Sequence, residues 1–272
     1  MNVFMRAAGH RRFKYLLFSG TLLALLVCMF PSSAKTADVE DLFSQGNRAY
    51  AEGSYDEALG YYQALMKKEG FSASLLYNMA NAYYQKKEVG QAILNYQRAL
   101  YLEPGNPDIQ ANLRLAKKDF GLGPEPPSGW QRYLNILNLN QWTWLASIAT
   151  GVFCFIFLFR GIAPKILPRR LSRGIVAGFL VLAGVSCAGV IHQYLDMDRG
   201  VIIGHNPRLL VSPFDSASSS AQLRDGEIVR ITKAYEDFVL VKCPEGKSGW
   251  IVREAVEPVI PLKQPLIFGP RA

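Results

Sequence analysis

The sequence predicts a multidomain chain that combines an all-α helical array, two transmembrane helices and a small all-β domain. Residues 39–106 repeat a pattern of small and aromatic side chains with one constant spacing, the spacing from Leu42 to Leu76. Two apolar stretches, 141–159 and 174–195, are each about 20 residues long, which matches a hydrocarbon core of about 30 Å. Beyond residue 196, short runs of alternating polarity are broken by turn residues, a pattern typical of strands.

The helical array is predicted by the register of the repeat. The run LFSQGNRAY, which begins at Leu42, aligns without a gap with LYNMANAYY, which begins at Leu76. Small residues recur where the two helices of a unit would cross, and a bulky partner recurs beside them: Gly46 and Ala80, Ala58 and Ala92, Tyr62 and Tyr96. This pattern resembles the tetratricopeptide repeat, a helix–turn–helix unit that stacks on its neighbours.

Two repeat units rarely bury a stable core alone, so a further helix is expected to cover them. Asn106 followed by Pro107 is typical of a helix N-terminus. An apolar stripe of Ile109, Leu113 and Ala116 follows before Gly121. We therefore expect a capping helix that closes the array near residue 120.

The start of the chain predicts a secretory signal peptide over residues 1–34. The chain begins with a basic segment that contains Arg6, Arg11, Arg12 and Lys14. An apolar run from Tyr15 to Phe30 follows, and then the small residues Ser32–Ala34. We expect cleavage after Ala34, with an uncleaved membrane anchor as the alternative. The repeats would then lie outside the cytoplasm.

The two apolar stretches predict a membrane hairpin. Trp142 and Trp144 stand at the entry of the first stretch, as expected for an interfacial aromatic belt. The loop from Arg160 to Arg173 carries five basic residues and no acidic one, which predicts that it faces the cytoplasm. Most of the net charge of +8 thus has a topological explanation, and a nucleic-acid partner is not expected.

Helical spacing of apolar residues before the first stretch predicts a short amphipathic segment on the membrane surface. These residues are Trp130, Tyr133, Leu134 and Leu137. The predicted order is a signal peptide (1–34), repeats with a capping helix (35–120), a linker and interfacial segment (121–140), a transmembrane helix (141–160), a cytoplasmic loop (161–173), a transmembrane helix (174–195), a β-domain (196–260) and a tail (261–272).

Four runs predict strands of a small barrel: 208–211, 227–231, 238–241 and 249–252. The sequence Gly249-Trp250-Ile251 near the end resembles the bacterial SH3-like domain. That resemblance implies a shallow groove for cell-wall peptides or other extended segments. Phe238 and Trp250 are candidates for contact with such a ligand. Either could equally belong to the core, and we favour a core position for Trp250.

The sequence predicts no enzymatic chemistry. Its three histidines, His10, His192 and His205, belong to no cluster with metal-ligand spacing. We find no nucleophile turn and no glycine-rich phosphate loop, so neither a catalytic residue nor a cofactor is expected. Only Cys243 would face an oxidising compartment, which leaves no intramolecular disulfide framework.

Candidate binding residues come from the repeat register, which places the first helix of each unit on the concave face. The residues expected there are Phe43, Asn47 and Tyr50 in the first unit and Tyr77, Asn81 and Tyr84 in the second. An asparagine amide can pair with both the N–H and the C=O of an extended peptide. We place both asparagines outside the helix-crossing core. The alternative is that the aromatic residues merely cover the inner surface.

The order of these segments resembles the BatE proteins of bacterial aerotolerance operons. The runs from Tyr77 to Tyr84 and from Asn106 to Leu113 are similar to that family's repeat and cap. The resemblance implies a non-catalytic protein of the bacterial inner membrane whose globular domains are both extracytoplasmic. It also implies partners among membrane-anchored von Willebrand A-domain proteins and a MoxR-type ATPase. A tether that binds peptidoglycan through the SH3-like domain is the alternative function.

Overall fold

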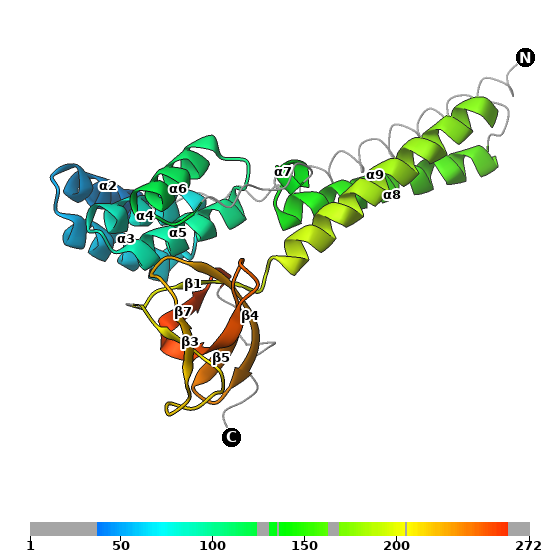
Figure 1. Cartoon of the computed structure of the whole chain (residues 1–272). Helices are drawn as coiled ribbons and strands as arrows, with labels where there is room; N and C mark the ends of the chain where they lie inside the picture. Colours follow the sequence, from blue (N-terminus) through cyan, green and yellow to red (C-terminus); the bar gives the residue numbers. More distant parts are fainter. Residues whose placement is uncertain (1–36, 124–130, 135, 163–168, 205, 261–272) are drawn as a thin grey trace, which may run out of the picture. The chain divides into compact units, whose positions relative to one another are not determined.

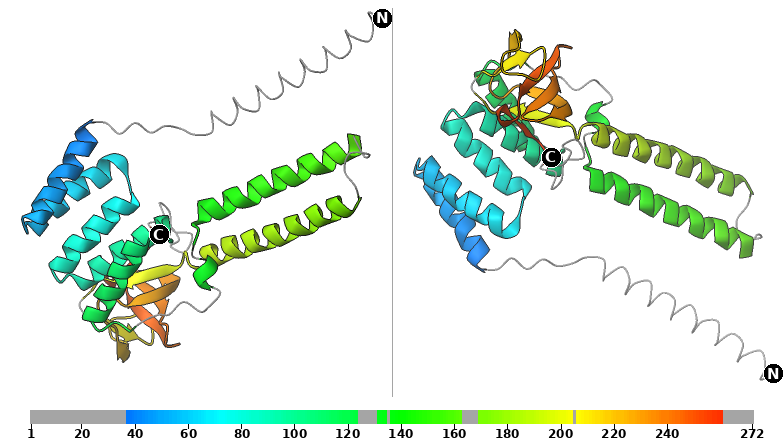
Figure 2. Two further views of the ribbon diagram at one scale, coloured as in Figure 1. Left: turned by 90° about the horizontal axis from the view of Figure 1, so that it is seen from above. Right: turned by 90° about the horizontal axis from the view of Figure 1, so that it is seen from below.

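The repeat region is a stack of helices that lie side by side (Figures 1 and 2). The computed structural model describes residues 37–123, 131–134, 136–162, 169–204 and 206–260. The helices of the stack are α2 (Ala37–Ala51), α3 (Tyr55–Glu69), α4 (Ala73–Gln85), α5 (Val89–Leu102) and α6 (Pro107–Asp119). The predicted signal peptide and the predicted tail lie outside the described residues.

Small residues allow these helices to approach closely, as the repeat register predicts. Ala58, Ala80 and Ala92 are fully buried. A Cβ atom added to Gly46 would lie 2.5 Å from Cε1 of Tyr62, a distance that no real Cβ contact tolerates. The predicted helix crossings are therefore confirmed in the first unit as well as in the second.

The turn after each first helix shows that α6 begins a third unit. Gly53, Lys87 and Gly121 occupy the same position of successive units and adopt φ angles of 80°, 64° and 66°. Asn106 caps α6 as predicted, because its side-chain oxygen accepts hydrogen bonds from the backbone N–H groups of Asp108 and Ile109. The predicted capping helix thus has the geometry of a first helix in a repeat.

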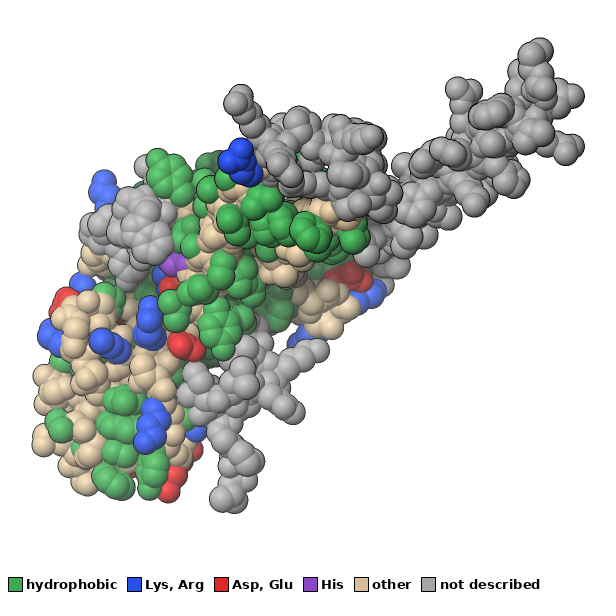
Figure 3. Space-filling view, turned by 90° about the vertical axis from the view of Figure 1, so that its right-hand side faces the viewer, with side chains coloured by type: hydrophobic (Ala, Val, Ile, Leu, Met, Phe, Trp, Pro, Cys, Tyr) green, Lys and Arg blue, Asp and Glu red, His purple; other side chains and the backbone are tan. Residues whose placement is uncertain are grey.

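Helices α8 (Leu139–Ile162) and α9 (Arg169–Leu195) pack side by side through stacked rings of Phe153 and Phe179, whose centroids are 4.3 Å apart. Their segments Leu139–Leu158 and Arg173–Leu195 are long and apolar enough to cross a membrane. Many of their large apolar side chains are exposed, and Phe157 and Val181 keep 69% and 68% of their surface accessible. Figure 3 shows hydrophobic side chains gathered over this helix pair.

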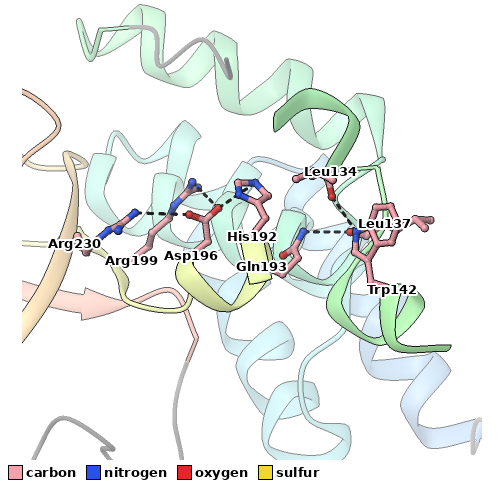
Figure 4. Close-up of polar contacts among 8 residues, drawn as sticks. All are labelled: Leu134, Leu137, Trp142, His192, Gln193, Asp196, Arg199 and Arg230. Carbon is pink, nitrogen blue, oxygen red and sulfur yellow. Dashed lines mark hydrogen bonds and ion pairs between the residues drawn. The ribbon is translucent and has the colours of Figure 1, made fainter. Parts of the chain in front are cut away.

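Trp142 contributes to packing between these helices, contrary to the expected place in an aromatic belt. Its ring is buried against Gly189, where an added Cβ would lie 2.5 Å from Cε2 of the ring. Its Nε1 donates to the carbonyl of Leu134 in the short helix α7 (Gln131–Leu134), 3.0 Å away (Figure 4). Trp144, by contrast, is 54% exposed and remains available for an interface.

The C-terminal region is one antiparallel sheet in the order β3-β2-β6-β5-β4-β1-β7. The four predicted strands are confirmed, and β4 extends beyond its predicted end. The strands are β1 (Arg199–Ile202), β2 (Arg208–Leu210), β3 (Ser219–Gln222), β4 (Ile228–Tyr235), β5 (Phe238–Lys242), β6 (Ser248–Val252) and β7 (Val256–Pro258). Alternate residues such as Val239, Val241 and Ile251 form its core.

The sheet also packs against the end of the helical stack, which the sequence did not predict. Val201, Ile228 and Val259 belong to the same buried cluster as apolar side chains of α5 and α6. Arg98 of α5 donates to a carboxylate oxygen of Glu257 at 2.7 Å and to the carbonyl of Val259 at 3.1 Å. The sheet therefore buries apolar surface at this end of the stack.

Candidate protein-binding groove

A hydrogen-bonded group of three side chains joins the first unit to the second. Oδ1 of Asn47 accepts a hydrogen bond from the hydroxyl of Tyr62 at 2.8 Å and another from Nδ2 of Asn78 at 2.9 Å. Tyr62 is almost fully buried, so its hydroxyl needs this acceptor. Asn47 thus joins the two helices of its own unit and links them to the next unit.

The second unit repeats this arrangement at the equivalent positions. Oδ1 of Asn81 accepts from the hydroxyl of Tyr96 at 2.5 Å and from Nδ2 of Asn112 at 3.1 Å. The same nitrogen of Asn112 donates to the hydroxyl of Tyr77 at 2.8 Å. We call the two groups, Asn47–Tyr62–Asn78 and Asn81–Tyr96–Asn112, the asparagine ladder.

The asparagines therefore have a structural role that the sequence interpretation missed. We expected Asn47 and Asn81 to stand outside the helix-crossing core, and neither is buried; each nevertheless accepts the hydroxyl hydrogen of a buried tyrosine. A signal was present in the sequence. Tyr62 follows Asn47, and Tyr96 follows Asn81, by the same 15 residues.

The ladder uses the oxygens of Asn47 and Asn81 and the nitrogens of Asn78 and Asn112. An amide has both a carbonyl acceptor and N–H donors. Asn47 and Asn81 can therefore offer N–H groups to a ligand, while Asn78 and Asn112 can offer carbonyl oxygens. Each of the two groups, which we call the rungs of the ladder, has the donor and the acceptor that one residue of an extended peptide backbone requires.

A cavity of about 250 Å³ lies on the first rung. It is lined by Asn47, Tyr50, Tyr62, Asn78 and Asn81. The structure thus brings together three of the predicted groove residues, Asn47, Tyr50 and Asn81, and adds Tyr62 and Asn78. The five lining residues are all Asn or Tyr, so none carries a charged side chain at neutral pH. Burial raises the pKa of Tyr62 to about 12. The lining is suited to an uncharged ligand.

The other predicted groove residues, Phe43, Tyr77 and Tyr84, lie beside this cavity rather than in its lining. The rings of Phe43 and Tyr77 pack on the buried tyrosines of the ladder, with centroid distances of 6.3 Å to Tyr62 and 6.1 Å to Tyr96. Their position favours the covering role that we kept as an alternative.

Tyr84 is engaged at the third unit. Its hydroxyl donates to Oδ2 of Asp119 at 2.5 Å, and its ring meets that of Phe120 edge to face at a centroid distance of 5.6 Å. The hydrogen bond to Asp119 raises the pKa of Tyr84. The ammonium of Lys87 lies 5.2 Å from the centre of the same ring.

Of the two β-domain candidates, Phe238 is buried, whereas Trp250 does not occupy the core position that we favoured. Trp250 is only half-buried, because the alternation along β6 turns Gly249 and Ile251 inward and the tryptophan outward. Its ring meets that of Tyr235 edge to face at 6.4 Å. Phe238 is 8% exposed and therefore offers little surface to a ligand.

Within the described part of the chain, no group of three or more His, Cys, Asp or Glu residues is placed to hold a metal ion. Cys243 is a free, buried cysteine, and burial raises the pKa of its thiol. Cys154 and Cys187 are free and exposed on the apolar helices.

Comparison with known proteins supports the helical part of this description. Residues 73–106 match the tetratricopeptide repeat family. The chain contains a tetratricopeptide repeat. The match covers α4, α5 and the turn that follows, and such a repeat indicates a scaffold for protein–protein interaction.

Two curated relatives are each called Photosystem I assembly protein Ycf3, from Synechococcus sp. strains CC9605 and CC9902. Each is 32% identical to this chain over 107 residues, which is 38% of this chain. The chain spans 62% of the length of either relative, so the similarity concerns part of each protein.

Proposed function

We propose that this protein is a membrane-anchored scaffold whose repeat groove holds an extended segment of a partner protein. The observation that carries the proposal is the cavity on the asparagine ladder, with its uncharged lining of amides and phenols. Amide donors and acceptors match the polar groups of a peptide backbone. Tyrosine rings supply apolar contact area at a small cost in conformational entropy.

The anchoring is supported by the two apolar helices, whose large side chains face outward. In water such surfaces would be costly to expose, whereas in a bilayer they are solvated by lipid. With the basic loop in the cytoplasm, the repeats and the β-domain would lie on the extracytoplasmic side of a bacterial inner membrane. An impermeant thiol reagent should then label a cysteine placed at Ser218 in intact cells and spare one placed at Ser172.

The partner class follows from the likeness to assembly proteins. The curated relatives are named for photosystem I assembly, and we propose an assembly role here on a different membrane complex. The resemblance to aerotolerance-operon proteins suggests that the complex contains von Willebrand A-domain proteins and a MoxR-type ATPase.

Replacing asparagine by aspartate tests the groove, because aspartate keeps the oxygen that the ladder needs and removes the N–H donor. The double variant Asn47→Asp, Asn81→Asp should stay folded and lose its membrane partners on co-purification. Each lost donor costs about 1–3 kcal/mol where a carbonyl oxygen is left unpaired, roughly a tenfold loss of affinity.

The matched control is Gln63→Glu with Gln97→Glu, which adds the same charge at equivalent positions of the second helices, outside the cavity lining. This variant should retain the partners. Recovery of the same partners at wild-type yield by the folded aspartate variant would rule out recognition through the ladder.

A second candidate function is a cell-wall tether that acts through the β-domain. The half-buried Trp250 beside Tyr235 favours it, because paired rings on a sheet surface can stack on a ligand. Co-sedimentation of the protein with isolated cell-wall sacculi, lost in Trp250→Ala, would support the tether. Equal sedimentation of the variant would count against it.

A further inference from the structure

Three basic residues stand directly opposite one another on neighbouring strands. Arg199 of β1 pairs with Arg230 of β4, which in turn pairs with Lys242 of β5. Like charges placed opposite each other destabilise a sheet. We call Arg199, Arg230 and Lys242 the basic row. A negatively charged group beside the row would reduce the repulsion between these side chains.

A carboxylate of the same chain supplies part of this negative charge. Oδ2 of Asp196 accepts a hydrogen bond from Nη2 of Arg199 at 2.8 Å, and Oδ1 lies 4.0 Å from Nη2 of Arg230 (Figure 4). Asp198, in the same turn, is exposed. Even with both carboxylates counted, the row keeps an excess positive charge, and the side chains of Arg199 and Arg230 remain 36% and 49% exposed.

The basic row follows directly after the apolar helix α9, and this position indicates which anion could bind. Helix α9 ends at Leu195, and the apolar segment of α9 ends at the same residue. Arg199 follows four residues later. The polar headgroup layer begins where the hydrocarbon ends and is roughly 5–8 Å deep on each side of a bilayer. If α9 spans the membrane as proposed above, the basic row starts at the depth of the lipid phosphates.

We propose that the basic row binds the headgroup of an anionic phospholipid. Guanidinium groups form paired hydrogen bonds with phosphate oxygens, and an ammonium adds a compact charge. Asp196 holds Arg199 in place and leaves the outer part of the row open to the lipid. Because β1 also packs against α5, a bound headgroup would hold the repeat groove at a set position above the membrane.

The proposal is tested with the full chain in a neutral detergent. The protein is incubated with equal amounts of phosphatidylglycerol and phosphatidylcholine that carry the same acyl chains, and the retained lipids are counted by native mass spectrometry. Wild type should retain phosphatidylglycerol preferentially. Since each basic residue near an anionic surface contributes about fivefold to binding, Arg230→Gln with Lys242→Gln should reduce the preference more than tenfold.

Two further variants serve as controls. Lys67→Gln with Arg114→Gln removes the same charge from exposed positions on α3 and α6 and should change nothing. Lys242→Arg keeps the charge and should retain the preference. Thermal melting shows that each variant is folded.

An unchanged preference in the folded Arg230→Gln, Lys242→Gln variant would overturn the proposal. Displacement of the lipid by inorganic phosphate at equal concentration would overturn it as well, because the site would then take free phosphate. Partner co-purification through the groove is a separate readout, since none of these residues lines the cavity.

Discussion

Replacing Asn47 by alanine should destabilise the first repeat unit more than replacing Tyr62, the residue that it holds, by phenylalanine. Oδ1 of Asn47 is the acceptor for the Tyr62 hydroxyl at 2.8 Å, and the Tyr62 side chain is 1% exposed. Alanine at position 47 would remove that acceptor and leave the hydroxyl at the wall of the cavity without its protein partner. Phenylalanine at position 62 would remove the hydroxyl together with its need for a partner.

The magnitudes follow from these two situations. A buried donor without an acceptor costs about 1–3 kcal/mol, so Asn47→Ala should lower the free energy of unfolding by that amount. Loss of an ordinary hydrogen bond costs about 0.5–1.5 kcal/mol, which is the expectation for Tyr62→Phe. In the double variant no hydroxyl is stranded. Its destabilisation should therefore fall short of the sum of the single effects by about 1 kcal/mol.

Hydrogen exchange of the full chain in neutral detergent measures these free energies locally, through the protection of backbone amides in α2, α3 and α4. The equivalent pair Asn81→Ala and Tyr96→Phe should give the same pattern in the second unit, because Tyr96 is also 1% exposed. If the effects of Asn47→Ala and Tyr62→Phe add to within about 0.5 kcal/mol, the hydrogen bond of the ladder is not what stabilises the unit.

Three further outcomes are expected. Gly46→Ala should lower the melting temperature, since the new Cβ would lie 2.5 Å from Tyr62 and overpacking costs about 1–3 kcal/mol, whereas Gly60→Ala in open space should raise stability by about 0.5–1 kcal/mol. The pKa of Tyr62 is raised by burial from 10.0 to about 12. The stability that this raised pKa contributes is therefore complete below pH 10 and disappears as the pH rises through 12. The melting temperature should therefore fall between pH 10 and pH 12, and Tyr62→Phe should remove this component. Gly189→Leu should separate α8 from α9, because Trp142 fills the space beside it, while Gly184→Leu, with nothing within 4 Å, should not; equal melting of the two leucine variants would contradict this packing.

The sequence alone determined the features that have a short period or a local signal. The constant spacing of the repeat marks the helices and their crossings, because every unit must meet its neighbour through the same small residues. The cap at Asn106 depends on its own side chain and the next two backbone amides, and the four strands show their alternation directly. Hydropathy and length likewise mark the two apolar helices.

The tertiary structure decided which groups each side chain meets across the fold. The repeat placed Asn47 and Asn81 on the inner surface, but only the packed helices show that their oxygens are used by buried tyrosines. Alternation predicts that Trp250 and Ile251 point to opposite faces, yet which face is buried depends on the rest of the sheet. The contact of Arg98 with β7 joins residues far apart in the chain, and no local pattern encodes such a pairing.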